Sequence, residues 1–143
     1  METAQTIIFT AGEDHLHMDV VRIADPGSPG DGEARLTMKV QSSGFAGQGS
    51  WWADETSFET FVRDLTRLAR TMKGKAELRH KWRPDITFGI VPITSRGHFA
   101  VEGQISDTIH GREHAFFHSV RFSFEIELAQ IEKAARQLSV LTE

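Results

Sequence analysis

The stretch "HGREHAFFHSVRFSF", residues 110–124, decides the fold, because it fits either a helix or a strand. A helix would place Gly111 in its interior at a cost of about 1 kcal/mol and would fuse with the next apolar segment into an uncapped run of about 33 residues. A strand avoids both the interior glycine and the uncapped run, and its alternate side chains form one apolar row. That row, which we expect to face the core, comprises Phe116, Val120, Phe122 and Phe124. We therefore predict a strand, with Gly111 in the turn before it and with Arg121 and Ser123 facing solvent.

Histidines occupy every fourth position of this stretch, at His110, His114 and His118. On one helix face neighbouring imidazoles can share a metal ion, but along a strand residues four apart are separated by roughly 13 Å. Metal–nitrogen bonds are only about 2 Å long, so the predicted strand cannot chelate an ion through this spacing. His15 and His17 share a strand face, but the sequence places no third ligand beside them. We predict no metal site and no cofactor.

The rest of the chain alternates in the same way. In "ARLTMKVQ", residues 34–41, the apolar residues Leu36, Met38 and Val40 alternate with polar ones, which is typical of a half-buried strand. Similar segments are "TIIF", "HLHMDVVRI", "GFAGQGSWWA", "KAELRHKW", "ITFGIV" and "HFAVEGQI". The segment "DPGSPGDG", residues 25–32, is dense in turn formers and indicates a surface loop between two antiparallel strands.

Two segments have the period of amphipathic helices. In the first, residues 58–72, the apolar face comprises Phe58, Phe61, Val62, Leu65, Leu68, Ala69 and Met72. Asp54 or Thr56 can cap its start, and Gly74 is placed to end it. The second helix is expected in "ELAQIEKAARQLSVL", residues 127–141. The order of strands, helix, strands and helix predicts an α+β fold with a mainly antiparallel sheet of about seven strands and both helices on one face.

Length and composition favour one soluble domain over residues 1–143. The absence of cysteine excludes disulfides, a thiolate nucleophile and cysteine-ligated metals. No apolar run approaches the roughly 20 residues of a membrane span, and the N-terminus lacks the features of a signal peptide, so we expect a cytoplasmic protein without membrane association. A net charge of −4 argues against a general polyanion binder.

No familiar catalytic motif is present, neither a nucleophile elbow nor a phosphate-binding loop nor a dinucleotide fingerprint. Paired carboxylates such as Glu125 and Glu127 lie at element ends, where the helix dipole explains them. We therefore expect a protein that is not an enzyme.

The best candidates for partner binding are aromatic and basic side chains. Trp51 and Trp52 are adjacent on a strand and point to opposite faces, so the second tryptophan needs either a cover within the fold or a partner. Basic residues form a stripe on the first helix, and "RHKWRP" places three more beside a tryptophan. The candidate residues are Trp51, Trp52, Arg63, Arg67, Arg70 and Trp82. Core packing and a solvated helix face are the structural alternatives.

Two segments together resemble a known family. They are "SWWADETSFETFVRDLTRLARTMKGKAEL" and "VRFSFEIELAQIEKAARQL", separated by three predicted antiparallel strands. The arrangement over residues 34–141 is similar to the WapI-type immunity proteins of bacteria. The resemblance implies binding and neutralisation of a toxin encoded beside the gene, and it carries over no site residue.

The sequence thus favours a non-catalytic protein-binding domain, of the immunity type that the resemblance implies. Two alternatives stay open. One is a nucleic-acid-associated protein that uses the arginine stripe and the segment around Trp82, because aromatic residues among basic ones can hold single strands. The other is a metal- or ligand-binding enzyme built on the histidines, which requires a pocket lined by His15, His17 or His114.

Overall fold

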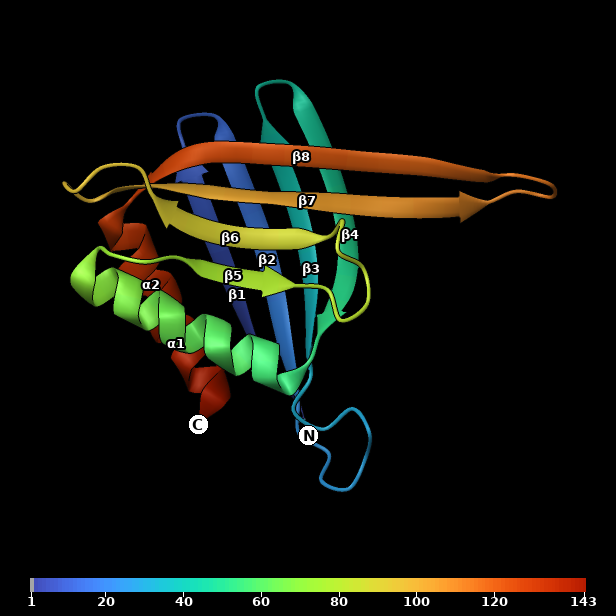
Figure 1. Ribbon diagram of the computed structural model, residues 1–143, viewed down its shortest axis with the longest axis horizontal. Helices are drawn as coiled ribbons and strands as arrows, with labels where there is room; N and C mark the ends of the chain where they lie inside the picture. Colours follow the sequence, from blue (N-terminus) through green and yellow to red (C-terminus); the bar gives the residue numbers. More distant parts are fainter. Residues whose placement is uncertain (1) are drawn as a thin grey trace.

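The computed structural model describes residues 2–143 and shows an α+β fold with eight strands in two sheets (Figure 1). Sheet A consists of β1 (Glu2–Ala11), β2 (Asp14–Ile23), β3 (Ala34–Ser42) and β4 (Phe45–Ala53), in that order. Sheet B consists of β5 (Ala76–Arg79), β6 (Thr87–Pro92), β7 (His98–His110) and β8 (Ala115–Glu127). All neighbouring strands are antiparallel. The helices are α1 (Glu55–Thr71) and α2 (Leu128–Ser139), and a short 3-10 turn, η1 (Val140–Thr142), follows α2.

The prediction of an antiparallel α+β fold with two helices is confirmed, but the prediction of one sheet of about seven strands is wrong. Side-chain alternation shows which face of a strand is buried, and it does not show which strands pair. The chain forms one meander before α1 and a second meander after it, and β4 and β5 are not neighbours in a sheet. The apolar faces of the two meanders cover each other.

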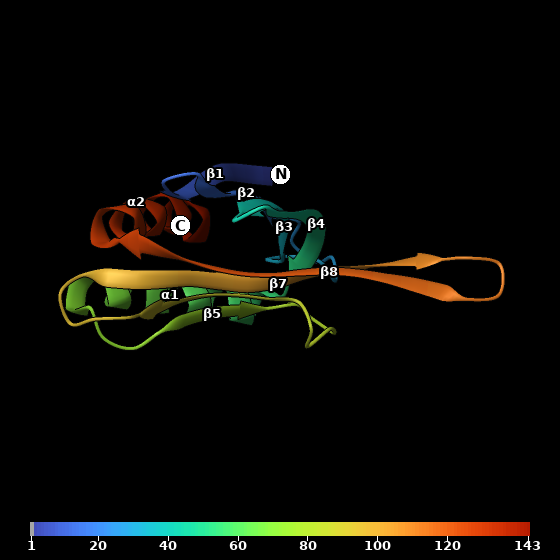
Figure 2. The same cartoon turned by 90° about the horizontal axis from the view of Figure 1, so that it is seen from above.

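The strands of the two sheets cross at a large angle, with sheet A behind sheet B in Figure 1. On one side β4 contacts β7 and β8 directly, and on the other side α1 contacts β5 while α2 contacts β1 and α1 (Figure 2). The helices therefore close the open side between the sheets. Phe88 of β6 lies at the centre, with its ring centroid 6.2 Å from that of Phe9 in sheet A and 5.7 Å from that of Phe61 in α1.

Both predicted helices are confirmed. Asp54 caps α1 by accepting a hydrogen bond of 2.7 Å from the backbone N–H of Ser57, as its position before the apolar pattern predicts. At the other end Met72 adopts the left-handed conformation, with φ at 58°, and ends the helix two residues before Gly74. Among residues 2–143, neither helix has the length and apolar character of a membrane span.

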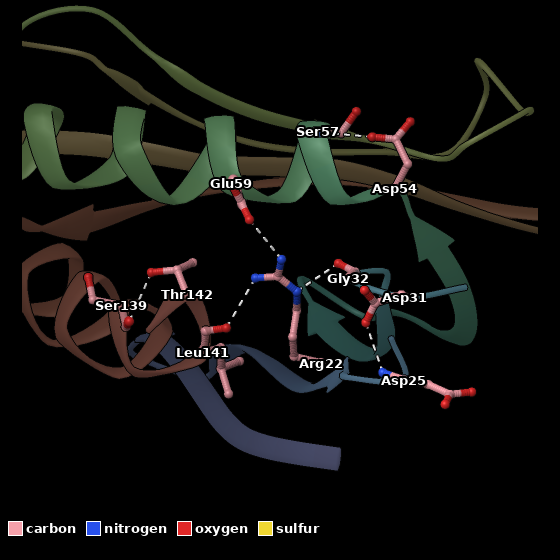
Figure 3. A network of polar contacts seen from close by, with 10 residues as sticks. All are labelled: Arg22, Asp25, Asp31, Gly32, Asp54, Ser57, Glu59, Ser139, Leu141 and Thr142. Atoms are coloured by element: carbon pink, nitrogen blue, oxygen red, sulfur yellow. Dashed lines mark hydrogen bonds and ion pairs between the residues drawn. The ribbon is translucent and has the colours of Figure 1, made fainter. Parts of the chain in front are cut away.

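Arg22 fixes the end of β2 to three other segments (Figure 3). Its Nε donates to the carbonyl of Gly32 at 2.7 Å, its Nη1 to the carbonyl of Leu141 at 3.1 Å, and its Nη2 to Glu59 Oε1 at 2.9 Å. The guanidinium also lies 5.1 Å from the centre of the Phe58 ring, and the residue is only 8% exposed. One buried cation thus joins sheet A, the loop before β3, α1 and the C-terminal turn.

Close approach of the sheets at β4 depends on two glycines. A Cβ at Gly49 would stand 2.7 Å from Ile105 Cγ2, and a Cβ at Gly47 would stand 3.1 Å from Val120 Cβ. Both distances are shorter than normal carbon contacts, so only glycine lets β4 cross the β7–β8 pair at this depth. Beyond this crossing the β7–β8 hairpin leaves the body of the molecule (Figure 1).

Candidate functional site

The β7–β8 hairpin projects far beyond both sheets, as Figures 1 and 2 show. None of the residues from 106 to 119 is buried. Three large apolar side chains lie close to its end: Ile109 is 53% exposed, Phe116 is 56% exposed and Phe117 is 76% exposed. We call these three residues the hairpin tip. Ile109 and Phe116 are paired across the two strands and share one face of the ribbon, and Phe117 points to the opposite face. Large apolar side chains exposed on a projecting element are typical of a surface that another protein covers.

The strand prediction for residues 110–124 is confirmed over β8, which is extended from Ala115 to Glu127. The prediction that Phe116 packs in the core is wrong. Its side chain shares a face with the buried Phe122 and Phe124, and Ile109 lies opposite it on β7, but the body of the molecule ends before it. Alternation gives the face of a strand and not what covers that face. Phe117, out of phase with the apolar row, was the sequence signal for an exposed tip.

The histidines do not gather around a common point. His110 ends β7, His114 lies in the turn and His118 lies on β8. His15 and His17 line an open hollow of about 570 Å³ on the outer face of sheet A, where His17 Nε2 is 3.4 Å from Asp19 Oδ1. Within residues 2–143, no group of three or more histidines and carboxylates has the geometry to hold a metal ion.

The three tryptophans have different environments. Trp51 is 2% exposed, and its Nε1 donates to Met38 Sδ at 3.2 Å, so its place is in the core. Trp52 is half-buried, with the Arg35 guanidinium 5.8 Å from its ring centre. Trp82, in the loop between β5 and β6, is 76% exposed beside the Lys81 ammonium. Binding of a partner by these residues stays a prediction, and Trp52 and Trp82 are the tryptophans that a partner can reach.

His80 links the buried and the exposed tryptophan. Its ring stacks on Trp51 with centroids 6.1 Å apart and lies 6.3 Å from the ring of Trp82. Its Nδ1 accepts hydrogen bonds from the backbone N–H groups of Trp82 and Arg83, at 3.0 and 3.1 Å. Burial lowers the pKa of His80, the charge of Arg83 lowers the pKa further, and the carboxylate of Asp85 opposes both effects. The neutral imidazole therefore holds the loop that carries Trp82.

This arrangement predicts a pH dependence of stability. Because the folded state binds the His80 proton less tightly than the unfolded state, the contribution of His80 is complete above its ordinary pKa of 6.5 and is lost as the pH falls below it towards the folded pKa. The free energy of unfolding, measured in urea, should therefore decrease as the pH falls through this window. In His80→Gln, whose amide oxygen can also accept the two N–H groups, the decrease should be smaller. An NMR titration that gave His80 a pKa at or above 6.5 would contradict this.

The predicted basic stripe lies on the exposed face of α1. Arg63 Nε and Arg67 Nη1 are 3.7 and 3.9 Å from Asp64 Oδ1, so one carboxylate offsets part of their charge. The stripe with Arg70 borders a hollow of about 280 Å³ that also contacts the C-terminal turn. In Figure 1, α1 lies at the opposite end of the molecule from the hairpin tip. The fold therefore does not bring the arginine stripe and the hairpin tip together.

The largest exposed apolar side chains of this fold, Phe45, Trp82 and Phe117, lie on its surface and not in a closed cavity. The model of the WapI-like immunity protein family matches residues 7–143, nearly the whole chain. This chain belongs to the WapI-like immunity protein family, which confirms the resemblance found in the sequence. No curated protein and no solved structure shows significant similarity to it.

Proposed function

We propose that this chain is a non-catalytic immunity protein that neutralises a cognate bacterial toxin by binding it in the cytoplasm. The family supports a toxin as the class of partner. The observation that carries the binding mode is the hairpin tip, where Ile109, Phe116 and Phe117 are each more than half exposed. Burial of such side chains in a partner's pocket releases their apolar surface from water, which is the main source of affinity at interface centres.

The predicted partner-binding residues enter the proposal as a second contact region. Trp82 and Trp52 offer aromatic surface at one end of sheet B, where the Lys81 backbone N–H donates to the Trp52 carbonyl at 3.1 Å. Arg63, Arg67 and Arg70 offer charge on α1. Because exposed charges at the rim of an interface mainly affect association rates, we assign the arginines to steering and the hairpin tip to affinity.

The test uses the C-terminal toxin domain encoded by the neighbouring gene. Co-expression of this chain should restore growth of cells that produce the toxin domain, and the two purified proteins should form a stable complex. Phe117→Ala should weaken the complex about 30-fold or more, as expected for an aromatic anchor. Trp82→Ala tests the second contact region at equal exposure, since Trp82 and Phe117 are both 76% exposed, and it should weaken the complex less than Phe117→Ala does.

The two variants separate the two candidate surfaces. If Trp82→Ala weakens binding and Phe117→Ala does not, the anchor lies in the β5–β6 loop instead of the hairpin. If the parent chain neither binds nor protects, the proposed function is wrong. A gel shift with single-stranded DNA that weakens steeply with salt would instead favour the nucleic-acid alternative.

A further inference from the structure

The free edge of β8 can be compared with the outer edges of β1, β5 and β4. β1 is closed by α2, since Gln130 bonds both the N–H and the carbonyl of Thr10 and Gln137 bonds the carbonyl of Thr6. β5 has only four residues and contacts α1, and the end of β4 accepts a hydrogen bond from Lys81. In residues 2–143, no backbone hydrogen bond from an element other than β7 reaches β8 between residues 115 and 123.

The register shows which backbone groups are free on this edge. Gly111 N–H donates to the His114 carbonyl at 2.8 Å, and at the other end Leu128 N–H donates to the Gly97 carbonyl at 3.2 Å. Hydrogen-bonded and non-bonded pairs alternate in an antiparallel ladder, so even-numbered residues of β8 bond to β7. The odd-numbered residues direct their N–H and carbonyl groups away from β7, and these residues are Ala115, Phe117, Ser119, Arg121 and Ser123.

This edge lacks the features that keep strands from pairing. Natural edge strands carry lysine, proline or a bulge, or they lie under another element. Residues 115–123 contain neither lysine nor proline, and their pairing with β7 is regular to the turn. A two-stranded ribbon that projects into water is also only marginally stable alone. The β7–β8 ribbon can therefore accept a third strand along the free edge of β8.

A hollow lies beside the edge where such a strand would pass. The β3–β4 turn extends over β8, and Phe45 at its end is 69% exposed. Phe45 and Val40 line one wall of a hollow of about 190 Å³, and β8 residues from Val120 to Ser123 line the other. A second open hollow, of about 530 Å³, lies between β4 and the β7–β8 ribbon, and β8 lines it from Phe117 to Val120. An added strand would find apolar cover for one of its faces.

The charge of the β8 edge indicates which kind of strand could add to it. Arg121 is exposed and lines a hollow of about 520 Å³ on sheet B together with Glu77 and Glu102, but no carboxylate of residues 2–143 lies within ion-pair distance of it. The chain as a whole is acidic, with a net charge of −4, whereas residues 115–123 carry one arginine and no acidic side chain. A segment with an acidic residue opposite Arg121 is therefore complementary in charge to this edge.

From these observations we infer that an extended segment of the toxin adds to the free edge of β8 as a fifth strand of sheet B, with an apolar side chain against Phe45 and an acidic one beside Arg121. This inference rests on the proposed function. Strand addition supplies main-chain hydrogen bonds for affinity, and the alternate side chains supply specificity. The hairpin tip and the β8 edge then belong to one continuous surface, because Phe117 contributes to both.

The first measurement is amide hydrogen exchange by NMR, on the full chain alone and bound to the toxin domain encoded by the neighbouring gene. In the complex the odd-numbered amides of β8, from Ala115 to Arg121, should exchange about 100-fold more slowly, because each gains an acceptor. The even-numbered amides already bond to β7 and should change little. The amides of β4 serve as an internal control for the other exposed edge.

The second measurement uses two variants of one residue. The Ser119 N–H faces away from β7, so Ser119→Pro removes an edge donor and leaves the ladder intact, whereas Ser119→Ala keeps the donor. Ser119→Pro should weaken the complex about 30-fold and Ser119→Ala less than about threefold. A toxin complex in which both variants bind alike and the odd-numbered amides stay fast overturns strand addition alone. Absence of any complex overturns the proposed function as well. If the odd-numbered amides of β8 become protected from exchange in the free chain as its concentration rises, the added strand comes from a second copy of this chain and not from the toxin.

Discussion

Replacement of Arg22 by alanine should lower the free energy of unfolding by about 3 kcal/mol, since it removes a buried cation and leaves its acceptors unpaired. The acceptors are the carbonyls of Gly32 and Leu141 and the carboxylate of Glu59, which lie on three different segments. The Phe58 ring also loses the guanidinium that covers it. Urea unfolding followed by tryptophan fluorescence measures the change.

Two variants show whether the hydrogen bonds or the packing of Arg22 are responsible. Arg22→Met keeps an unbranched side chain. It should still show most of the decrease in the free energy of unfolding that Arg22→Ala shows, because methionine donates to none of the three acceptors. Arg63→Ala on α1 is the surface control, and since its side chain is 66% exposed the loss should stay within about 0.5 kcal/mol. Equal effects of Arg22→Ala and Arg63→Ala would contradict the role of Arg22.

The sequence predicted local structure better than the arrangement of that structure in space. The period of Phe58, Phe61 and Leu65 predicts α1, and Asp54 predicts its start, because helix periodicity and capping are local effects. Whether β4 pairs with β5 depends on contacts across the whole chain, and here α1 separates them. The division into two crossed sheets therefore could not be obtained from alternation alone.

The candidate site shows the same limit. Trp51 and Trp52 were correctly expected to need different environments, because adjacent strand residues face opposite sides. The core ends where β4 crosses β8 at two glycines. The sequence does not indicate this boundary, since the effect of the glycines depends on Ile105 and Val120, which lie on other strands. Without that boundary, Phe116 reads as a core residue although it lies on the projecting hairpin.

A chain with a shortened hairpin should fold and yet lose its partner. Residues 108–117 include no buried side chain, so their removal leaves the core unchanged. Asp107 and His118 form a hydrogen-bonded pair by the alternation of the ladder, and a two-residue Asn-Gly turn can join such a pair. We expect the shortened chain to keep its stability within about 1 kcal/mol, because an exposed two-stranded ribbon adds little to a fold.

Its affinity for the toxin domain should fall about 100-fold or more, since Ile109, Phe116 and Phe117 are removed together and interface energy concentrates in such anchors. Calorimetric titration measures the affinity, and growth of toxin-producing cells measures protection. The control is Arg112→Ala in the full-length chain, which changes the same turn but keeps the tip and should bind as the parent does. If the shortened chain still binds and protects like the parent, the toxin contacts the body of the molecule, and Trp82 with the α1 arginines becomes the surface to mutate next.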